Sequence, residues 1–403
     1  MSVPHLFRCP ISLDIFTDPV TLSTGQTYDR PCIERWLAAG HRTCPVTMQP
    51  LAADAVLVPN RTLRHLIERW LSADHLHLPE PAANDAEEEP SLAALKRRLL
   101  SGAGTAGARV AALKRAATLA ADSDVGRACM LQMGFLPVLL QLVFRSPPPP
   151  PGYRFEEEEL ALHCALGLLP ASPAAPQLDC LNVLRKEASL ASLVRLLERG
   201  GGRIRAALCR LLVAIAAAAA TRELALAVAA SPRVWRALLP LLLRHDDDER
   251  VPGPAARAVA ALCAAGGEAA GSCAVCHDAV GALLGHLSWA SSGKGGGGGG
   301  GAAASALAAV AAVAASEAGR RAVAREPGAV RALVRHVFVM PASDEGSEHA
   351  VAALLAVCRE SRAARGEAAG AGVVTQLLLL LQSQCGGRAK AKARALLKLL
   401  KSV

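Results

Sequence analysis

The chain has 403 residues, enough for two or three domains. Hydrophobic residues make up 52% of it and aromatic residues only 3%, and a core of Ala, Leu and Val predicts close-packed helices rather than a β-sandwich or a barrel. No apolar run reaches the eighteen or so residues that span a bilayer, and the first residues lack the pattern of a secretory signal. We therefore expect a cytoplasmic protein, with the nucleus and a membrane surface as further locations, and no transmembrane segment.

The net charge of +9 is unevenly distributed. Residues 1–78 hold seven basic and seven acidic residues, and residues 79–90 hold five acids and no base. The whole positive excess therefore lies in residues 91–403, which carry a net charge of +14. Such an excess suits an acidic partner, nucleic acid or a membrane surface.

The first region, residues 4–75, contains most of the turn signals. A hairpin is predicted within "DPVTLSTGQTYD", followed by a helix over 30–40 with Pro31 in its first turn and Gly40 at its end. A second helix is predicted over 62–72, with Asn60 and Thr62 as candidate caps.

Two short stretches in this region, "CPIS" at 9–12 and "CPVT" at 44–47, read as halves of zinc-binding Cys-x-x-Cys pairs. A RING-type module needs eight Cys or His ligands for two ions, whereas residues 1–78 contain only Cys9, Cys32 and Cys44. We therefore predict no metal and no cofactor. Hydrogen bonds and packing must hold these loops instead, from residues such as Ser12, Thr47, Asp29, Arg30 and Asn60.

An acidic, proline-flanked segment over 76–90 is predicted to be a flexible linker. Residues 91–403 then repeat an apolar block with a period near that of HEAT or armadillo arrays, which is about 40–47 residues. Each block follows an Ala/Leu-rich helix, so the unit is predicted to be helix, turn, helix, about six times, in an α-solenoid with a long concave surface. Proline-rich and glycine-rich insertions (146–159 and 291–301) lengthen two intervals. The blocks are anchored on Leu139, Leu193, Leu238, Leu283, Leu333 and Leu377.

The ordered motifs CPI, DPV, TYDR, IERWL, CPVT and PN-x-x-LR, spread over about seventy residues, resemble a U-box, the zinc-free relative of the RING. A U-box followed by armadillo repeats is similar to the plant U-box/armadillo ubiquitin ligases. The expected fold is mainly α, with a small α+β U-box and an α-solenoid of armadillo repeats.

The resemblance implies an E3 ubiquitin-protein ligase without a cofactor. Its U-box would bind a ubiquitin-charged E2 enzyme and promote direct transfer of ubiquitin to a lysine of a protein substrate held on the armadillo repeats, with no covalent E3 intermediate. The family's E2-facing groove maps to Ile11, Trp36 and Pro45. Structural roles map to Cys9, Ser12, Asp29, Arg30, Cys44, Thr47 and Asn60.

Other interpretations compete with this one. Trp36 on a lone amphipathic helix would be a core residue, and a catalytic Cys32 or Cys44 would need a positioned histidine base. Related ligases often carry a basic residue just after the second loop, where this chain has Met48 and Gln49, which puts efficient ubiquitin discharge in question but not E2 binding.

The alternative function is a non-enzymatic armadillo scaffold with a degenerate U-box. A nucleic-acid binder ranks third, because the positive charge is spread over many helices and aromatic residues for base stacking are few. We therefore expect no nucleic-acid partner. The family suggests roles in stress or immune signalling and homodimers through the U-box.

Overall fold

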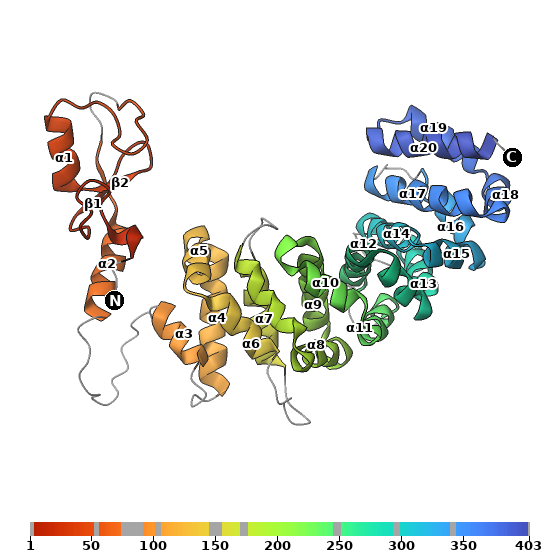
Figure 1. The fold of residues 1–403 in the computed structure, drawn as a ribbon, viewed down its shortest axis with the longest axis horizontal. Helices are drawn as coiled ribbons and strands as arrows, with labels where there is room; N and C mark the ends of the chain where they lie inside the picture. Colours follow the sequence, from red (N-terminus) through yellow and green to blue (C-terminus); the bar gives the residue numbers. More distant parts are fainter. Residues whose placement is uncertain are drawn as a thin grey trace. The chain divides into compact units, whose positions relative to one another are not determined.

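The computed structural model describes residues 4–51, 56–73, 92–100, 106–144, 155–169, 176–244, 251–292, 299–338 and 344–401. The chain forms two compact units, Met1–Glu88 and Glu89–Val403 (Figure 1). The linker predicted over 76–90 and the proline run at 147–151 lie outside the described residues.

The first unit is small and mixes helices with a three-stranded sheet in the order β2–β1–β3. Its elements in chain order are η1 (His5–Phe7), β1 (Pro19–Thr21), β2 (Thr27–Asp29), α1 (Arg30–Ala38), β3 (Val58–Pro59) and α2 (Arg61–Ala73).

β1 is the central strand of this sheet and pairs antiparallel with both neighbours. Val20 lies opposite Tyr28 of β2 and opposite Pro59 of β3. Gly25 turns the chain between β1 and β2 at φ 78°, a left-handed conformation that glycine adopts without steric cost. The predicted hairpin is therefore present.

α1 begins at Arg30, as predicted, whereas α2 begins at Arg61, one residue earlier than predicted, so the candidate cap Thr62 lies within the helix. Pro31 occupies the first turn of α1, and Gly40 follows its end at φ 89°. Asn60 precedes α2, and its Oδ1 accepts a hydrogen bond from the N–H of Leu63 at 3.1 Å. Both helices pack on one buried cluster: Cys9, Phe16, Val20, Leu22, Tyr28, Cys32, Ile33, Cys44, Leu51 and Ile67.

The second unit consists of α-helices and short 3₁₀ helices (Figure 1). In chain order they are α3 (Leu92–Leu100), α4 (Ala106–Asp122), α5 (Asp124–Gln132), α6 (Phe135–Val143), α7 (Glu156–Leu168), η2 (Pro176–Arg185), α8 (Glu187–Arg199), α9 (Gly202–Ala217), η3 (Ala219–Thr221), α10 (Arg222–Ala229), α11 (Pro232–Leu238), η4 (Leu239–Leu242), α12 (Pro252–Cys276), α13 (Ala279–Ser291), α14 (Gly299–Val313), α15 (Glu317–Arg325), α16 (Ala329–Arg335), α17 (Asp344–Glu360), α18 (Arg362–Gly370), α19 (Val373–Gln382) and α20 (Gly387–Lys401).

Two sets of helices build the solenoid. The anchor helices α6, α8, α11, α13, α16 and α19 contain the six period-defining leucines, all with 0% exposure. Each anchor helix packs on the long helix that follows it, and the long helices α4, α7, α9, α12, α14, α17 and α20 each contact the next in a continuous row. We call this the long-helix row. The predicted mainly helical fold, with an α-solenoid after a small α+β unit, is confirmed.

The repeat unit differs from the predicted pair of helices, because a short third helix joins one unit to the next. α5 meets α6 at 79°, and α15 leaves α14 at 120°. Serine side chains start three of these short helices by accepting a backbone N–H: Ser123, Ser316 and Ser361. These helices carry few large apolar residues, so their periodicity is weak in the sequence.

The glycine-rich insertion predicted over 291–301 is shorter than expected. Ser291 ends α13, and α14 begins at Gly299. Residues 293–298 lie outside the described residues.

By length and composition α12 is able to cross a membrane, and three bent helix pairs pass the same test if each pair is counted as one span. The composition of the chain had predicted no such segment. In the structure α12 is interrupted at Gly267, which has φ 56° and ψ −131°. α12 contacts α9, α10 and α14 within the solenoid, and 33% of its apolar window is buried there.

Candidate functional site

Residues 8–15 and 43–50 of the first unit form two turns with the same backbone pattern, which we call the first turn and the second turn. In each, the cysteine donates its N–H to the carbonyl five residues later, at 2.8 Å for Cys9 and 2.9 Å for Cys44. In each, an isolated β-bridge closes the ends of the turn. Two stretches far apart in the sequence therefore present the same loop geometry.

The tight part of each turn depends on a residue with positive φ. The carbonyl of Cys9 accepts the N–H of Leu13 at 2.8 Å, and that of Cys44 accepts the N–H of Met48 at 2.9 Å. Leu13 has φ 63° and Met48 has φ 58°. Non-glycine residues rarely adopt this region, so both turns hold a strained residue at the same position.

Hydrogen bonds occupy the sulfur of Cys9. It accepts the backbone N–H of Asp29 at 3.3 Å. Burial acts to raise the pKa of the Cys9 thiol, but the bonds from the backbone N–H groups of Asp29, Ser12 and Ile11 and from the Ser12 hydroxyl together lower it. Ser12 stands where a zinc module would place its second thiolate.

The sulfur of Cys44 is held in the same way. It lies 3.0 Å from the Tyr28 hydroxyl and 3.4 Å from the Thr24 hydroxyl, and the Thr47 hydroxyl also bonds to it. Burial acts to raise the pKa of this thiol, but the bonds from Thr24, Thr47 and Tyr28 together lower it to about 6.

Tyr28 joins the sheet to the second turn. Its hydroxyl bonds Cys44 and also accepts the N–H of Val46 at 3.2 Å. Burial, followed by the bond to Cys44, raises the pKa of Tyr28, so its hydroxyl stays protonated at neutral pH. The sequence reasoning did not identify Tyr28, whose position in a buried strand suggested packing alone.

The turns expose apolar side chains at matching positions. Ile11 and Leu13 of the first turn are 37% and 64% exposed, and Val46 and Met48 of the second are 53% and 67% exposed. Two exposed apolar pairs on rigid turns form a surface suited to burial against another protein. Of these four, the sequence reasoning selected only Ile11.

The other two expected contact residues are half-buried. The indole N–H of Trp36 donates to the carbonyl of Thr43 at 2.9 Å, and its ring stacks on His41 with centroids 4.1 Å apart. Trp36 therefore fixes the start of the second turn, where Pro45 follows Cys44. Among the described residues, no hydrogen bond or ring contact joins Ile11 to Trp36 or Pro45.

The carboxylate of Asp29 ties the loop before the sheet to α1. It accepts the N–H and the hydroxyl of Thr17 at 2.9 and 2.7 Å and the N–H of Asp18 at 2.7 Å. Arg30 then pairs with Asp18 at 2.6 Å. These bonds connect the hairpin, the loop and the first helix.

Asn60 ties α2 to the hairpin. Its side-chain amide reaches the hydroxyls of Thr21 and Thr27, each at 3.4 Å, and its N–H donates to the carbonyl of Pro19 at 2.8 Å.

The described residues contain no group of three or more His, Cys, Asp or Glu side chains that could hold a metal ion.

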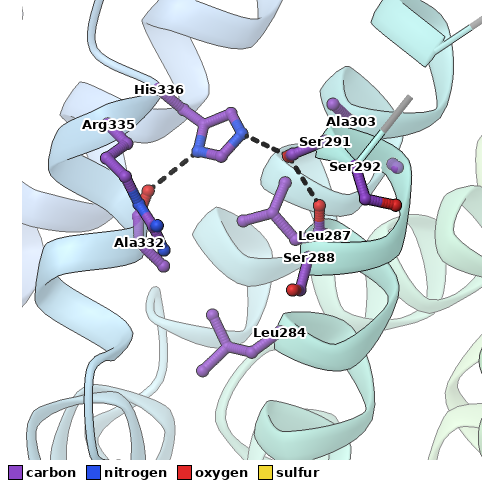
Figure 2. Close-up of a pocket in the computed structure, with 10 residues that line it drawn as sticks. Leu284, Leu287, Ser288, Ser291, Ser292, Ala303, Ala332, Arg335 and His336 are labelled. Atoms are coloured by element: carbon purple, nitrogen blue, oxygen red, sulfur yellow. Dashed lines mark hydrogen bonds between the residues drawn. The ribbon is translucent and has the colours of Figure 1, made fainter. Parts of the chain in front are cut away.

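The second unit contains a hollow of about 590 Å³ between α13 and α16 (Figure 2). The ring of His336 bridges the two helices: one nitrogen lies 2.9 Å from the Ser291 hydroxyl and the other 2.8 Å from the carbonyl of Ala332. The Ser291 hydroxyl also lies 2.7 Å from the carbonyl of Leu287. Both side chains thus bond backbone carbonyls of their own helices, an arrangement that secures the end of α13.

In a comparison with known protein families, each of the two units matches a known family. Residues 3–75 match the U-box domain family, and residues 92–403 match the family described as plant U-box protein ARM repeat region. U-box domain-containing protein 26 of Arabidopsis thaliana is 33% identical over 100% of this chain and 92% of its own length.

Two relatives are named as ligases. E3 ubiquitin-protein ligase PUB23 of Arabidopsis thaliana is 28% identical over 99% of this chain and 93% of its own length. E3 ubiquitin-protein ligase SPL11 of Oryza sativa subsp. japonica is 38% identical, over 36% of this chain and 22% of its own length. Since the family matches cover both units, the chain belongs to the plant U-box proteins with an armadillo-repeat region.

Proposed function

We propose that the protein is an E3 ubiquitin-protein ligase whose first unit binds a ubiquitin-charged E2 enzyme. The observation that carries the proposal is the pair of matched turns, which expose Ile11, Leu13, Val46 and Met48 within a U-box. The ligase names of two relatives support it.

The proposed mechanism is positioning rather than covalent catalysis. A ligase that forms a thioester with ubiquitin needs an accessible cysteine where the E2 docks, and in the first unit Cys9, Cys32 and Cys44 are only 0%, 7% and 0% exposed. The U-box would hold the E2 thioester beside the substrate lysine, which makes the transfer effectively unimolecular. The hydrogen bonds to Cys9 and Cys44 contribute by keeping the two docking turns rigid.

The armadillo repeats would hold the protein substrate. A row of long helices, each packed on the next, gives an extended surface on a rigid frame. Transfer from the E2 then goes to a lysine of that substrate, with no chemistry on the repeats themselves.

The test is discharge of a ubiquitin-charged E2 onto free lysine, measured with a panel of E2 enzymes. Ile11→Ala and Val46→Ala each remove exposed apolar surface without opening the core, so both are expected to slow discharge about tenfold. Val125→Ala, a change of equal chemistry at a residue 64% exposed in the second unit, serves as the matched control and should leave discharge unchanged.

Folded protein that discharges none of the E2 enzymes in the panel contradicts the ligase proposal. A non-enzymatic armadillo scaffold with a degenerate U-box is then the better account. Equal losses in Ile11→Ala and Val125→Ala would instead contradict the placement of the E2 contact on the two turns.

A further inference from the structure

The same position in the burial pattern recurs on six successive helices of the long-helix row, exposed on the first four and half-buried on the last two. On each helix two buried residues precede it, and a buried residue lies two positions after it. In chain order the side chains at this position are Lys114, His163, Arg210, Arg257, Ala308 and Ala352. The first four can all carry positive charge and the last two are alanine; we call the first four the basic row.

The basic row lies on neighbouring helices, because α4, α7, α9 and α12 each contact the next. His163 and Arg210 line one open hollow of about 340 Å³ between α7 and α9. The Arg257 guanidinium on α12 lies close enough to α9 to act on the Cys209 thiol. Burial raises the pKa of that thiol to about 12, and the positive charge of Arg257 opposes the rise.

Most of the charge in the basic row is available to a ligand. Within the described residues, His163, Arg210 and Arg257 make no ion pair or side-chain hydrogen bond with one another or with a carboxylate. Lys114 pairs with Glu156 at 3.2 Å, but the two side chains are 60% and 57% exposed, so water and salt weaken that ion pair.

The acidic side chains of α7 leave the hollow basic. Glu159 pairs with Arg203 at 3.6 Å beside His163 and Arg210. Glu157 is buried against Arg109 at 2.7 Å. The second unit as a whole also carries the entire positive excess of the chain.

We propose that the basic row binds an extended, carboxylate-rich segment of the protein substrate. This inference rests on the proposed function, since it names the class of substrate that the repeats would hold. Helices packed about 10 Å apart match about three residues of an extended chain, which rises about 3.3 Å per residue. The positive charges of Lys114, Arg210 and Arg257, with His163 between the first two, therefore suit a segment of about ten residues rich in Asp and Glu.

The same features argue against other anionic ligands. The six recurring positions include no Phe, Tyr or Trp on which a base could stack. They also include no large apolar residue that could enter a bilayer.

The test is fluorescence anisotropy of the full-length protein with a labelled decapeptide of alternating Asp and Ser. The matched peptide has Asn in place of Asp. The Arg210→Glu/Arg257→Glu variant is compared with Arg236→Glu/Arg335→Glu, which makes the same charge change at exposed positions on the anchor helices α11 and α16. Circular dichroism establishes that both variants are folded.

Wild type is expected to bind the Asp peptide, more weakly as salt rises, and not the Asn peptide. Arg210→Glu/Arg257→Glu should weaken binding about tenfold or more, because each reversal removes one exposed attraction and adds a repulsion. Arg236→Glu/Arg335→Glu should stay within about threefold of wild type, since distant exposed charges are largely screened.

Several results would overturn the inference: no binding of the Asp peptide, equal binding of the Asn peptide, or equal losses in the two double variants. Binding that depends on the basic row but is tighter for phosphatidylserine vesicles or for poly(U) would overturn it too. Discharge of E2 onto free lysine separates the two proposals. Discharge without peptide binding defeats only this inference, and peptide binding without discharge defeats only the ligase proposal.

Discussion

Tyr28 offers the sharpest test of how the second turn is held without a metal. Tyr28→Phe keeps the buried ring but removes the hydroxyl that lies 3.0 Å from the Cys44 sulfur and 3.2 Å from the Val46 nitrogen. Each lost hydrogen bond is worth about 0.5–1.5 kcal/mol, and a buried N–H left without an acceptor adds to that. We therefore expect the turn to lose about 2–3 kcal/mol of stability.

Hydrogen exchange with mass spectrometry on the full-length protein measures this loss locally. Since about 1.4 kcal/mol corresponds to a factor of ten, amides of the second turn should exchange about 30 to 150 times faster in Tyr28→Phe. Amides of α12 and α14, in the other unit, serve as the internal control and should not change. A change below threefold in the second turn would refute the claim that the Tyr28 hydroxyl holds it.

Three other predictions concern strain, pH and discharge. Gly319→Ala is expected to destabilise the second unit by about 1–3 kcal/mol in thermal unfolding, because a Cβ at this position collides with the carbonyl of Val313. Gly366→Ala on α18 is the control and should not destabilise the unit, because its Cβ position has open space around it. Equal destabilisation by the two substitutions would refute the packing argument. The pKa of Cys44 is lowered to about 6 from a reference value of 9.0, so this thiol contributes stability that is fully present above the unfolded pKa and is lost as pH falls through 6. Pulse proteolysis in urea should therefore show that the free energy of unfolding of wild type exceeds that of Cys44→Ser by an amount that grows from pH 5.5 to 8.5. A stability difference that stays constant with pH would contradict the lowered pKa. Met48→Ala should slow E2 discharge severalfold, because Met48 is 67% exposed on the second turn, where the E2 is proposed to dock. An unchanged rate would show that Met48 does not contribute to docking.

Much of the fold was predictable because its signals are local. Pro31, Gly40 and Asn60 mark helix ends through backbone geometry, and the structure places them at the ends of α1 and the start of α2. The six anchor leucines follow from the repeat period, which survives long insertions. The short third helices were missed because only serine caps and left-handed residues, such as Gly134 and Gly328, mark them.

The functional surface was less accessible to sequence reasoning. The resemblance to a U-box pointed to Ile11, Trp36 and Pro45. The exposure of Leu13, Val46 and Met48 was not predicted, because it depends on the backbone geometry that the two turns share, and this geometry is visible only in the structure. The basic row was also hidden, because its members lie 47 to 49 residues apart and share a face only once the buried positions of each helix are known.

The most direct test of the central claim is discharge of ubiquitin-charged E2 by the full-length protein in the presence and absence of a zinc chelator. The account predicts discharge that Ile11→Ala slows and that the chelator leaves unchanged, because hydrogen bonds to Cys9 and Cys44 hold the two turns. Discharge abolished by the chelator would contradict a metal-free docking site, and no discharge by the folded protein would contradict the ligase function itself.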